Sequence, residues 1–304
     1  MNNISRKNQS TYTPSFQAYY KSPFSKHLEQ VLQTRNGEQE LSNHFQKIFK
    51  AKKQASNKLG EGANGIVYRI DDYYVFKVYK NINPNSFNFN FKYSQENIFG
   101  TLKKYYGKVI AKFGQIEVIK NVTHNKHKFV ELANPATNGI KKYNEVLKEF
   151  VTLPQKAFDN LAKDFVELNK IHKSSLFYKF DTNNPNNFIK VGNSIRIVDD
   201  IDWVPSKEPN DIYSFMRIFI KEDGDANLKK QILKKCILAC EKNKIPINDT
   251  YDYLSNFMDD LFKNAGIKIS FEDYYIEMQN LRNTCKNDNI RMQKVKEYID
   301  KTIK

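Results

Sequence analysis

Hydrophobic and polar residues alternate along the chain from Lys58 to about Leu132. A period of two residues predicts β-strands, because successive side chains of a strand point to opposite faces of a sheet. One stretch, Tyr93–Tyr106, has a helical period and predicts a single helix among these strands. The stretches that predict strands are Ile66–Ile70, Tyr73–Tyr79, Val109–Val118 and Lys128–Leu132.

Beyond Pro135 the hydrophobic residues recur at helical spacing, which predicts amphipathic helices. A short pair of strands flanks Gly192-Asn193, a dipeptide that suits a tight hairpin. The pattern therefore predicts an α+β fold in which a strand-rich lobe with one helix precedes a mainly helical lobe. The predicted helices are Ile140–Glu149, Pro154–His172, Asp211–Ile220, Ala226–Asn243, Asp249–Lys263 and Phe271–Lys301, and the paired strands are Phe188–Val191 and Ser194–Val198.

The N-terminal segment differs from both lobes in composition. It begins as a polar, aperiodic stretch, and Ser25–Ala51 predicts its first helix. Residues 1–58 carry ten Lys and Arg against three Asp and Glu, a large share of the net charge of +15. An ordinary solvated tail explains this best, and contact with an acidic lipid or nucleic-acid surface is the alternative. The predicted division is a flexible basic segment at 1–57, the strand-rich lobe at 58–134 and the helical lobe at 135–304.

No apolar stretch is long enough to span a bilayer, and no charged-then-apolar leader opens the chain. We therefore expect a soluble protein without a transmembrane segment. The three cysteines are too few for a disulfide framework. Cys236 and Cys240 lie one helical turn apart with no histidine nearby, which favours buried apolar residues over half of a zinc site.

Glycine is scarce, at 11 of 304 residues, yet Gly60, Gly62 and Gly65 fall within six positions. A G-x-G-x-x-G cluster is a weak signal alone, and its dinucleotide-binding form requires a strand before it and a helix after it. Here a strand follows the cluster. We therefore expect the glycines in a strand-turn-strand flap, whose backbone amides can close over phosphates.

Lys77 lies in the next predicted strand and shares a face with Val75, because strand side chains alternate. It would point at the same cleft as the flap, while Lys80 would point away. An inward lysine between apolar neighbours needs an anion, and a triphosphate would supply one. Glu96, in the predicted helix that follows, is a candidate partner that would hold Lys77 in place; a solvated helix face is the alternative.

At this point the chain resembles a protein kinase over roughly residues 58–220. The resemblance rests on seven motifs that occur in the kinase order, of which each is modest alone. They are the flap from Gly60 to Val67, the lysine strand Val75-Phe76-Lys77, the hinge strand His127–Ala133, the helix ending at His172, the catalytic loop Lys179–Ile189, the hairpin ending at Asp199, and the helix start Asp211–Phe215.

The resemblance implies a bilobal kinase-like fold and transfer of a phosphoryl group from ATP with Mg²⁺, a reaction that depends on positioning and charge neutralisation. It also implies roles for individual residues. Lys77 would bind the α- and β-phosphates, backbone groups of Glu131 and Ala133 would bind adenine, Asp181 would orient the attacking hydroxyl, and Asn187 and Asp199 would hold magnesium.

The chain departs from the kinase pattern at several positions. Lys179-Phe180-Asp181 stands where a kinase has His-Arg-Asp. The loop is rich in turn-forming residues, so the alternative role of Asp181 is to form a turn. Counting from Asp181 favours Asn186 as the metal ligand, whereas the strand that follows favours Asn187. Asp199-Asp200-Ile201-Asp202 replaces Asp-Phe-Gly, so Asp200 and Asp202 remain alternative ligands.

Only eleven residues separate Asp199 from Asp211, which leaves no room for an activation segment with a phosphosite. A shortened kinase with a polar tail resembles the minimal type III effector kinases of bacteria, the OspG and NleH group. This likeness implies a Ser/Thr protein kinase that is secreted into a host cell and acts on host signalling, or is otherwise cytoplasmic. Some members are stimulated by ubiquitin or a ubiquitin-conjugating enzyme, which makes these candidate partners.

Two other functions remain open. A small-molecule phosphotransferase of the aminoglycoside or choline kinase type shares the fold; its His-Gly-Asp-x-His loop is absent here, although Ile201-Asp202-Trp203 is similar to a tripeptide found there. A pseudokinase scaffold is the second, but candidates for the lysine and both aspartates are present. The helical stretch Ala226–Lys304 would either complete the second lobe or bind a partner.

Overall fold

The computed structural model describes two compact units, residues 1–93 with 110–119 and residues 94–109 with 120–304. Within the described residues, no helix is long and apolar enough to cross a membrane. The described residues are 47, 50, 52–61, 65–71, 74–80, 109–113, 116–120, 129–170, 172–173, 176–178, 182–197, 205–206, 209–247 and 251–303.

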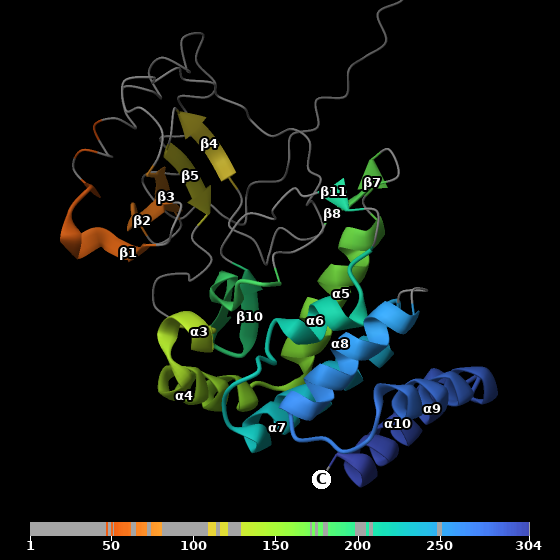
Figure 1. Cartoon of the computed structure of the whole chain (residues 1–304). Coiled ribbons are helices and arrows are strands. Elements are labelled where there is room, and N and C mark those ends of the chain that lie inside the picture. Colours follow the sequence, from red (N-terminus) through yellow and green to blue (C-terminus); the bar gives the residue numbers. More distant parts are fainter. Residues whose placement is uncertain are drawn as a thin grey trace, which may run out of the picture. The chain divides into compact units, whose positions relative to one another are not determined.

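The first unit contains a five-stranded sheet in the order β1-β2-β3-β5-β4 (Figure 1). Neighbours β1 and β2, and β2 and β3, are antiparallel. Tyr68 and Phe76 lie opposite each other and are buried, so this face of the sheet carries the core of the unit. The strands are β1 (Lys58–Glu61), β2 (Gly65–Arg69), β3 (Tyr74–Tyr79), β4 (Val109–Phe113) and β5 (Ile116–Lys120), preceded by the 3-10 turn η2 (Ala55–Asn57).

An aspartate closes the turn between β2 and β3. The Asp71 side chain accepts a hydrogen bond from the backbone N–H of Tyr74 at 3.0 Å, and the Ile70 N–H donates to the Tyr74 carbonyl at 3.0 Å. Asp is favoured in turns because its carboxylate can bond the backbone a few residues on. The predicted turn at this place is therefore confirmed, and the alternating stretch at 109–118 forms two strands, β4 and β5.

The second unit holds two three-stranded sheets, ordered β10-β9-β6 and β11-β8-β7. The predicted hairpin at Gly192 is confirmed, since β9 and β10 pair as antiparallel neighbours and Gly192 has a φ of 55°. Glycine adopts this left-handed conformation at little cost. The strands are β6 (Phe129–Glu131), β7 (His172–Lys173), β8 (Leu176–Tyr178), β9 (Phe188–Val191), β10 (Ser194–Ile197) and β11 (Pro205–Ser206).

Helices make up most of the second unit. Helix α7 packs on α4, α5, α6 and α10, and α8 packs on α6 and α9, so α7 lies at the centre of the core (Figure 1). Strands and helices together form an α+β structure, as predicted. The helices are α3 (Pro135–Asn138), α4 (Ile140–Val151), α5 (Gln155–Lys170), α6 (Ile212–Arg217), α7 (Ala226–Asn243), α8 (Tyr251–Asn264), α9 (Phe271–Thr284) and α10 (Asp288–Thr302).

The prediction of one helix over Phe271–Lys301 is wrong, because the chain forms two helices there. Helix α9 ends at Thr284, and Asn287 begins α10 by accepting hydrogen bonds from the N–H groups of Asn289 and Ile290 at 2.9 and 3.2 Å. An asparagine at this position satisfies backbone donors that the first helical turn leaves without partners. The break allows α10 to fold back and pack against α9 (Figure 1).

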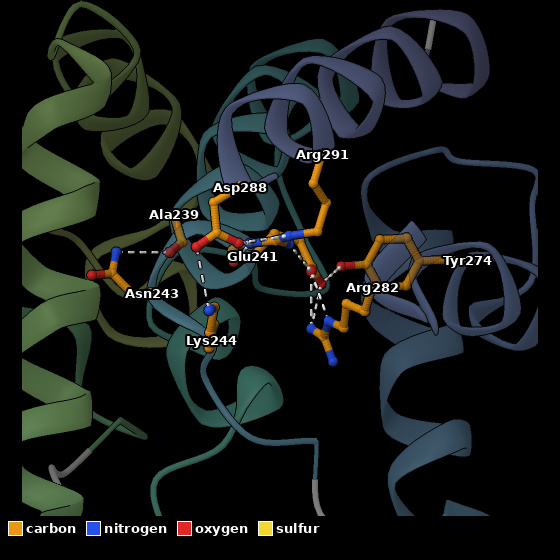
Figure 2. A network of polar contacts seen from close by, with 8 residues as sticks. All are labelled: Ala239, Glu241, Asn243, Lys244, Tyr274, Arg282, Asp288 and Arg291. Carbon is orange, nitrogen blue, oxygen red and sulfur yellow. Dashed lines mark hydrogen bonds and ion pairs between the residues drawn. The ribbon is translucent and has the colours of Figure 1, made fainter. Parts of the chain in front are cut away.

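A buried carboxylate joins α7 to both C-terminal helices (Figure 2). Glu241 is fully buried and accepts hydrogen bonds from Arg282 at 2.8 Å and from the Tyr274 hydroxyl at 3.0 Å. Arg291, also buried, lies 3.5 Å from the same carboxylate and donates to the Glu241 carbonyl at 3.2 Å. Burial of a charge is tolerated only when it is paired and hydrogen-bonded. Helices α9 and α10 are therefore an integral part of this unit.

The two helical cysteines lie in the core, as their spacing predicts. Cys236 and Cys240 on α7 have no exposed surface. Burial raises the pKa of both thiols well above their ordinary value, because the thiolate would lose its hydration. Among the described residues, no group of three or more His, Cys, Asp or Glu is arranged to hold a metal ion.

Candidate functional site

The glycine cluster lies on a hairpin formed by β1 and β2. Gly60 on β1 pairs with Val67, Gly65 begins β2, and the register shifts between Lys58 and Gly60. The strand-turn-strand arrangement predicted from the sequence is thus present, although Gly62 lies outside the described residues. A Cβ atom built on Gly60 would meet no atom within 4 Å among the described residues. Packing against the described residues therefore does not require glycine at this position.

Lys77 lies in a row of paired residues that crosses three strands. Gly60 pairs with Val67, and Val67 pairs with Lys77, so these residues share one face of the sheet. Val75, two positions before Lys77, lies on that face and is buried. Lys77 itself is half-buried. The expected placement of Lys77 on the face of Gly60 and Val67 is therefore observed within this unit.

Lys80, which directly follows β3, forms an ion pair with Glu61 on β1. Glu61 pairs with Ile66, one register position away from Val67. Its carboxylate bonds to Lys80 at 2.7 Å and to Lys58 at 2.5 Å, and these two lysines lower the pKa of Glu61 to about 2. A carboxylate on β1 thus reaches a lysine at the end of β3, across β2. We call this arrangement of Lys58, Glu61 and Lys80 the Glu61 ion-pair cluster.

In the second unit, the two residues expected to bind adenine lie at the end of strand β6, with Glu131 as its last residue and Ala133 two positions beyond it. The Leu132 N–H donates to the Phe188 carbonyl at 2.9 Å, which continues the pairing of β6 with β9. Backbone groups of an antiparallel strand face its partner at every second residue. The backbone groups of Glu131 therefore face away from β9, toward the outer edge of β6. An edge strand can offer these donors and acceptors to a planar ligand.

A turn rich in asparagine precedes β9. Asn184 begins the 3-10 turn η3 (Pro185–Asn187), and its side chain accepts a hydrogen bond from the Asn186 N–H at 3.2 Å. The Asn184 side-chain amide also donates to Asn187 Oδ1 at 3.1 Å. Asn187 is 8% exposed and comes immediately before β9. An amide oxygen is one of the ligand types that magnesium takes.

Asn186 has a different environment from its neighbour. Its side-chain amide donates to Glu131 Oε1 at 2.8 Å and approaches Asn138 Oδ1 at 3.4 Å. Asn186 is only partly buried, while Asn187 is buried. Spacing along the sequence could not distinguish these two asparagines as metal ligands, but their contacts differ.

The start of α6 is held to the end of α5 by a second asparagine pair. Asn169 accepts a hydrogen bond from the Asn210 N–H at 2.7 Å and donates to the Asn210 carbonyl at 2.8 Å. Asp211 then caps α6 by accepting from the Ser214 N–H at 2.7 Å. The sequence interpretation did not assign roles to Asn169, Asn184 or Asn210. Only Asn184 carries a local signal, because an asparagine before proline is typical of a helix N-cap.

Several predicted site residues lie outside the described part of the chain. These include the acidic candidates for catalysis and metal binding, so the described residues supply Asn187 as part of the expected magnesium site. The roles of all these residues stay predictions. They are Gly62, Glu96, Asp181, Asp199, Asp200 and Asp202.

Comparison with known proteins gives no family for this chain. It matches no protein-family model, no curated protein and no solved structure. The assignment of a function therefore depends on the residues and on the geometry within each unit.

Proposed function

We propose that this protein is an ATP- and magnesium-dependent protein kinase of the Ser/Thr type with a bilobal kinase-like fold. The observation that carries the proposal is the row formed by Gly60, Val67 and Lys77 across three strands. Protein kinases cover the nucleotide phosphates with a glycine-rich loop and place the phosphate-binding lysine on the third strand. In this chain the glycine hairpin is β1–β2, and Lys77 lies on β3.

The second unit supports the same proposal through the order of its elements. The pairing of β6 turns the backbone of Glu131 to the outer edge of this strand, Ala133 follows two positions later, and β9 begins directly after Asn187. Hydrogen bonds from such an edge would fix the adenine ring, and the turn before β9 would bring an asparagine to the phosphates. In protein kinases an asparagine of the catalytic loop holds one of the magnesium ions.

The mechanism in this proposal consists mainly of positioning and charge neutralisation. Lys77 would bind the α- and β-phosphates, and the amides of the glycine hairpin would enclose them. Asp181 would orient the acceptor hydroxyl in line with the γ-phosphate and accept its proton. Bound magnesium would neutralise charge that develops on the phosphate oxygens, and Asn187 with Asp199, or one of its aspartate neighbours, would hold it.

The biological setting is also part of the proposal. The short stretch between Asp199 and Asp211 supports a kinase without activation-loop control, of the kind that bacteria secrete into host cells. Its partners would be a host protein substrate and ubiquitin or a ubiquitin-conjugating enzyme. The basic N-terminal segment would serve as a solvated tail, with contact to an acidic surface as the alternative.

Calorimetric titration with ATP tests the proposal in the full-length chain. We expect ATP to bind in the presence of Mg²⁺ and binding to weaken strongly without it. Asp199→Ala and Asp202→Ala are compared, because only the variant that removes the true ligand should abolish the magnesium dependence. Wild-type protein that binds no ATP under either condition contradicts the proposal.

Binding without transfer to any protein would favour the pseudokinase scaffold, and transfer to an aminoglycoside or choline alone would favour the small-molecule phosphotransferase.

A further inference from the structure

The Asn186 side chain connects two segments that are far apart in the sequence. Its amide donates to Glu131 Oε1 at 2.8 Å, across 55 positions of the chain. The same amide lies 3.4 Å from Asn138 Oδ1, at the end of α3. These contacts join the turn η3 to β6 and to the short helix that follows it. A hydrogen bond to a carboxylate is stronger than one between neutral groups.

The backbone of Asn186 is held as firmly as its side chain. Asn184 Oδ1 accepts the Asn186 N–H at 3.2 Å, and the Asn187 N–H donates to the Asn184 carbonyl at 3.2 Å. The turn therefore orients the two asparagines differently. Asn186 reaches Glu131, while Asn187 is buried and accepts a hydrogen bond from the Asn184 amide.

We propose that Asn186 is a positioning residue that holds β6 through Glu131, which leaves the magnesium role to Asn187, as in the proposed function. This inference rests on the proposed kinase function. The Glu131 carbonyl and the Ala133 N–H would meet adenine from the outer edge of β6, so a shift of this strand would misplace both groups. Small errors in the position of a bound substrate weaken the reaction disproportionately.

The substitution Asn186→Asp separates this role from metal binding. It keeps the shape and the oxygen atom that a metal needs, but it removes the donor and places a negative charge against Glu131. We expect the KM for ATP to rise about fivefold, because a hydrogen bond to an exposed carboxylate contributes on the order of 1 kcal/mol. The kcat at saturating ATP and the magnesium concentration for half-maximal rate should stay within about twofold of wild type.

Two further variants serve as matched comparisons. Adding Glu131→Gln to Asn186→Asp gives the new carboxylate a donor again, so the KM for ATP should return toward the wild-type value. Asn187→Ala should instead raise the magnesium requirement, and Asn187→Asp should preserve it, because a carboxylate oxygen is also a magnesium ligand. If Asn186→Ala raises the magnesium requirement and Asn187→Ala does not, the assignment is overturned.

Amide hydrogen exchange tests the contact independently of activity. In Asn186→Asp we expect faster exchange at Leu132, whose N–H donates to Phe188, with an unchanged thermal midpoint for the whole chain. Unchanged exchange together with an unchanged KM for ATP would overturn the positioning role. If exchange at Leu132 is faster in Asn186→Asp but the protein binds no ATP, the Asn186–Glu131 contact is supported and the proposed kinase function is rejected. The two failures are therefore distinguishable.

Discussion

Val67 on β2 lies directly opposite Lys77 on β3, and both side chains project from the same face of the sheet. Gly60 pairs with Val67 from the other side and has no side chain to cover that face. The lysine therefore shares its face with the glycine hairpin, while Lys80 is engaged by Glu61. The proposed phosphate-binding role of Lys77 rests on this register.

The Glu61 ion-pair cluster, formed with Lys58 and Lys80, predicts a pH-dependent contribution of Glu61 to stability. Its pKa of about 2 lies below the ordinary 4.5, so the ion pairs stabilise the fold above pH 4.5. This contribution should disappear as the pH falls from 4.5 to about 2. Urea midpoints of wild type and Glu61→Gln should therefore differ at pH 6, and the difference should shrink at lower pH and in high salt. A difference that does not change between pH 6 and pH 2 would rule out this role.

The buried Glu241 predicts a large loss of stability on neutralisation. Glu241→Gln removes the carboxylate that pairs with the partly exposed Arg282, and it leaves the buried Arg291 with only the exposed Asp288 as a counter-charge, at a cost of about 3 kcal/mol. Glu145→Gln, at an exposed position of α4, is the matched control and should change stability by less than about 0.5 kcal/mol. Equal unfolding free energies for both variants in denaturant titrations would contradict the role of this network.

Gly224 and Gly139 form a pair that separates backbone strain from steric conflict. Both have positive φ, at 104° and 82°, but a Cβ on Gly224 would lie 2.6 Å from the Tyr143 ring. Tyr143 cannot retreat easily, because it is buried and its hydroxyl donates to the Phe219 carbonyl at 2.6 Å. Gly139→Ala should cost about 1 kcal/mol from strain alone, and Gly224→Ala about 3 kcal/mol. Thermal unfolding of the two variants should show this order, and the reverse order would refute it.

Much of the local structure is predictable because hydrophobic periodicity reports it directly. The β-branched and aromatic residues after Gly65 predict β2, and Asp71-Asp72 predicts the turn into β3. The Gly192-Asn193 hairpin follows from turn chemistry in the same way. These features depend on residues that are close together in the sequence.

Features that depend on distant residues are not predictable in this way. The pairing of β6 with β9 joins Glu131 to Ile189, and periodicity alone cannot say which strands become neighbours. The contact that distinguishes Asn186 from Asn187 is made with Glu131, which lies 55 positions before Asn186 in the sequence. The break after Thr284 has a local signal in Asn287, but the continuing helical period conceals it.

Transfer of labelled phosphate from ATP to a protein substrate, with Mg²⁺ present, tests the central claim most directly. Full-length wild type is compared with Lys77→Met and Lys80→Met, which each remove one lysine charge. We predict that Lys77→Met lowers kcat/KM at least about a hundredfold, because it removes a charge that stabilises the transition state. Lys80→Met should lower it less than about fivefold, since it disrupts only an exposed ion pair. Equal losses in the two variants, or wild-type protein that transfers no phosphate, would contradict the account.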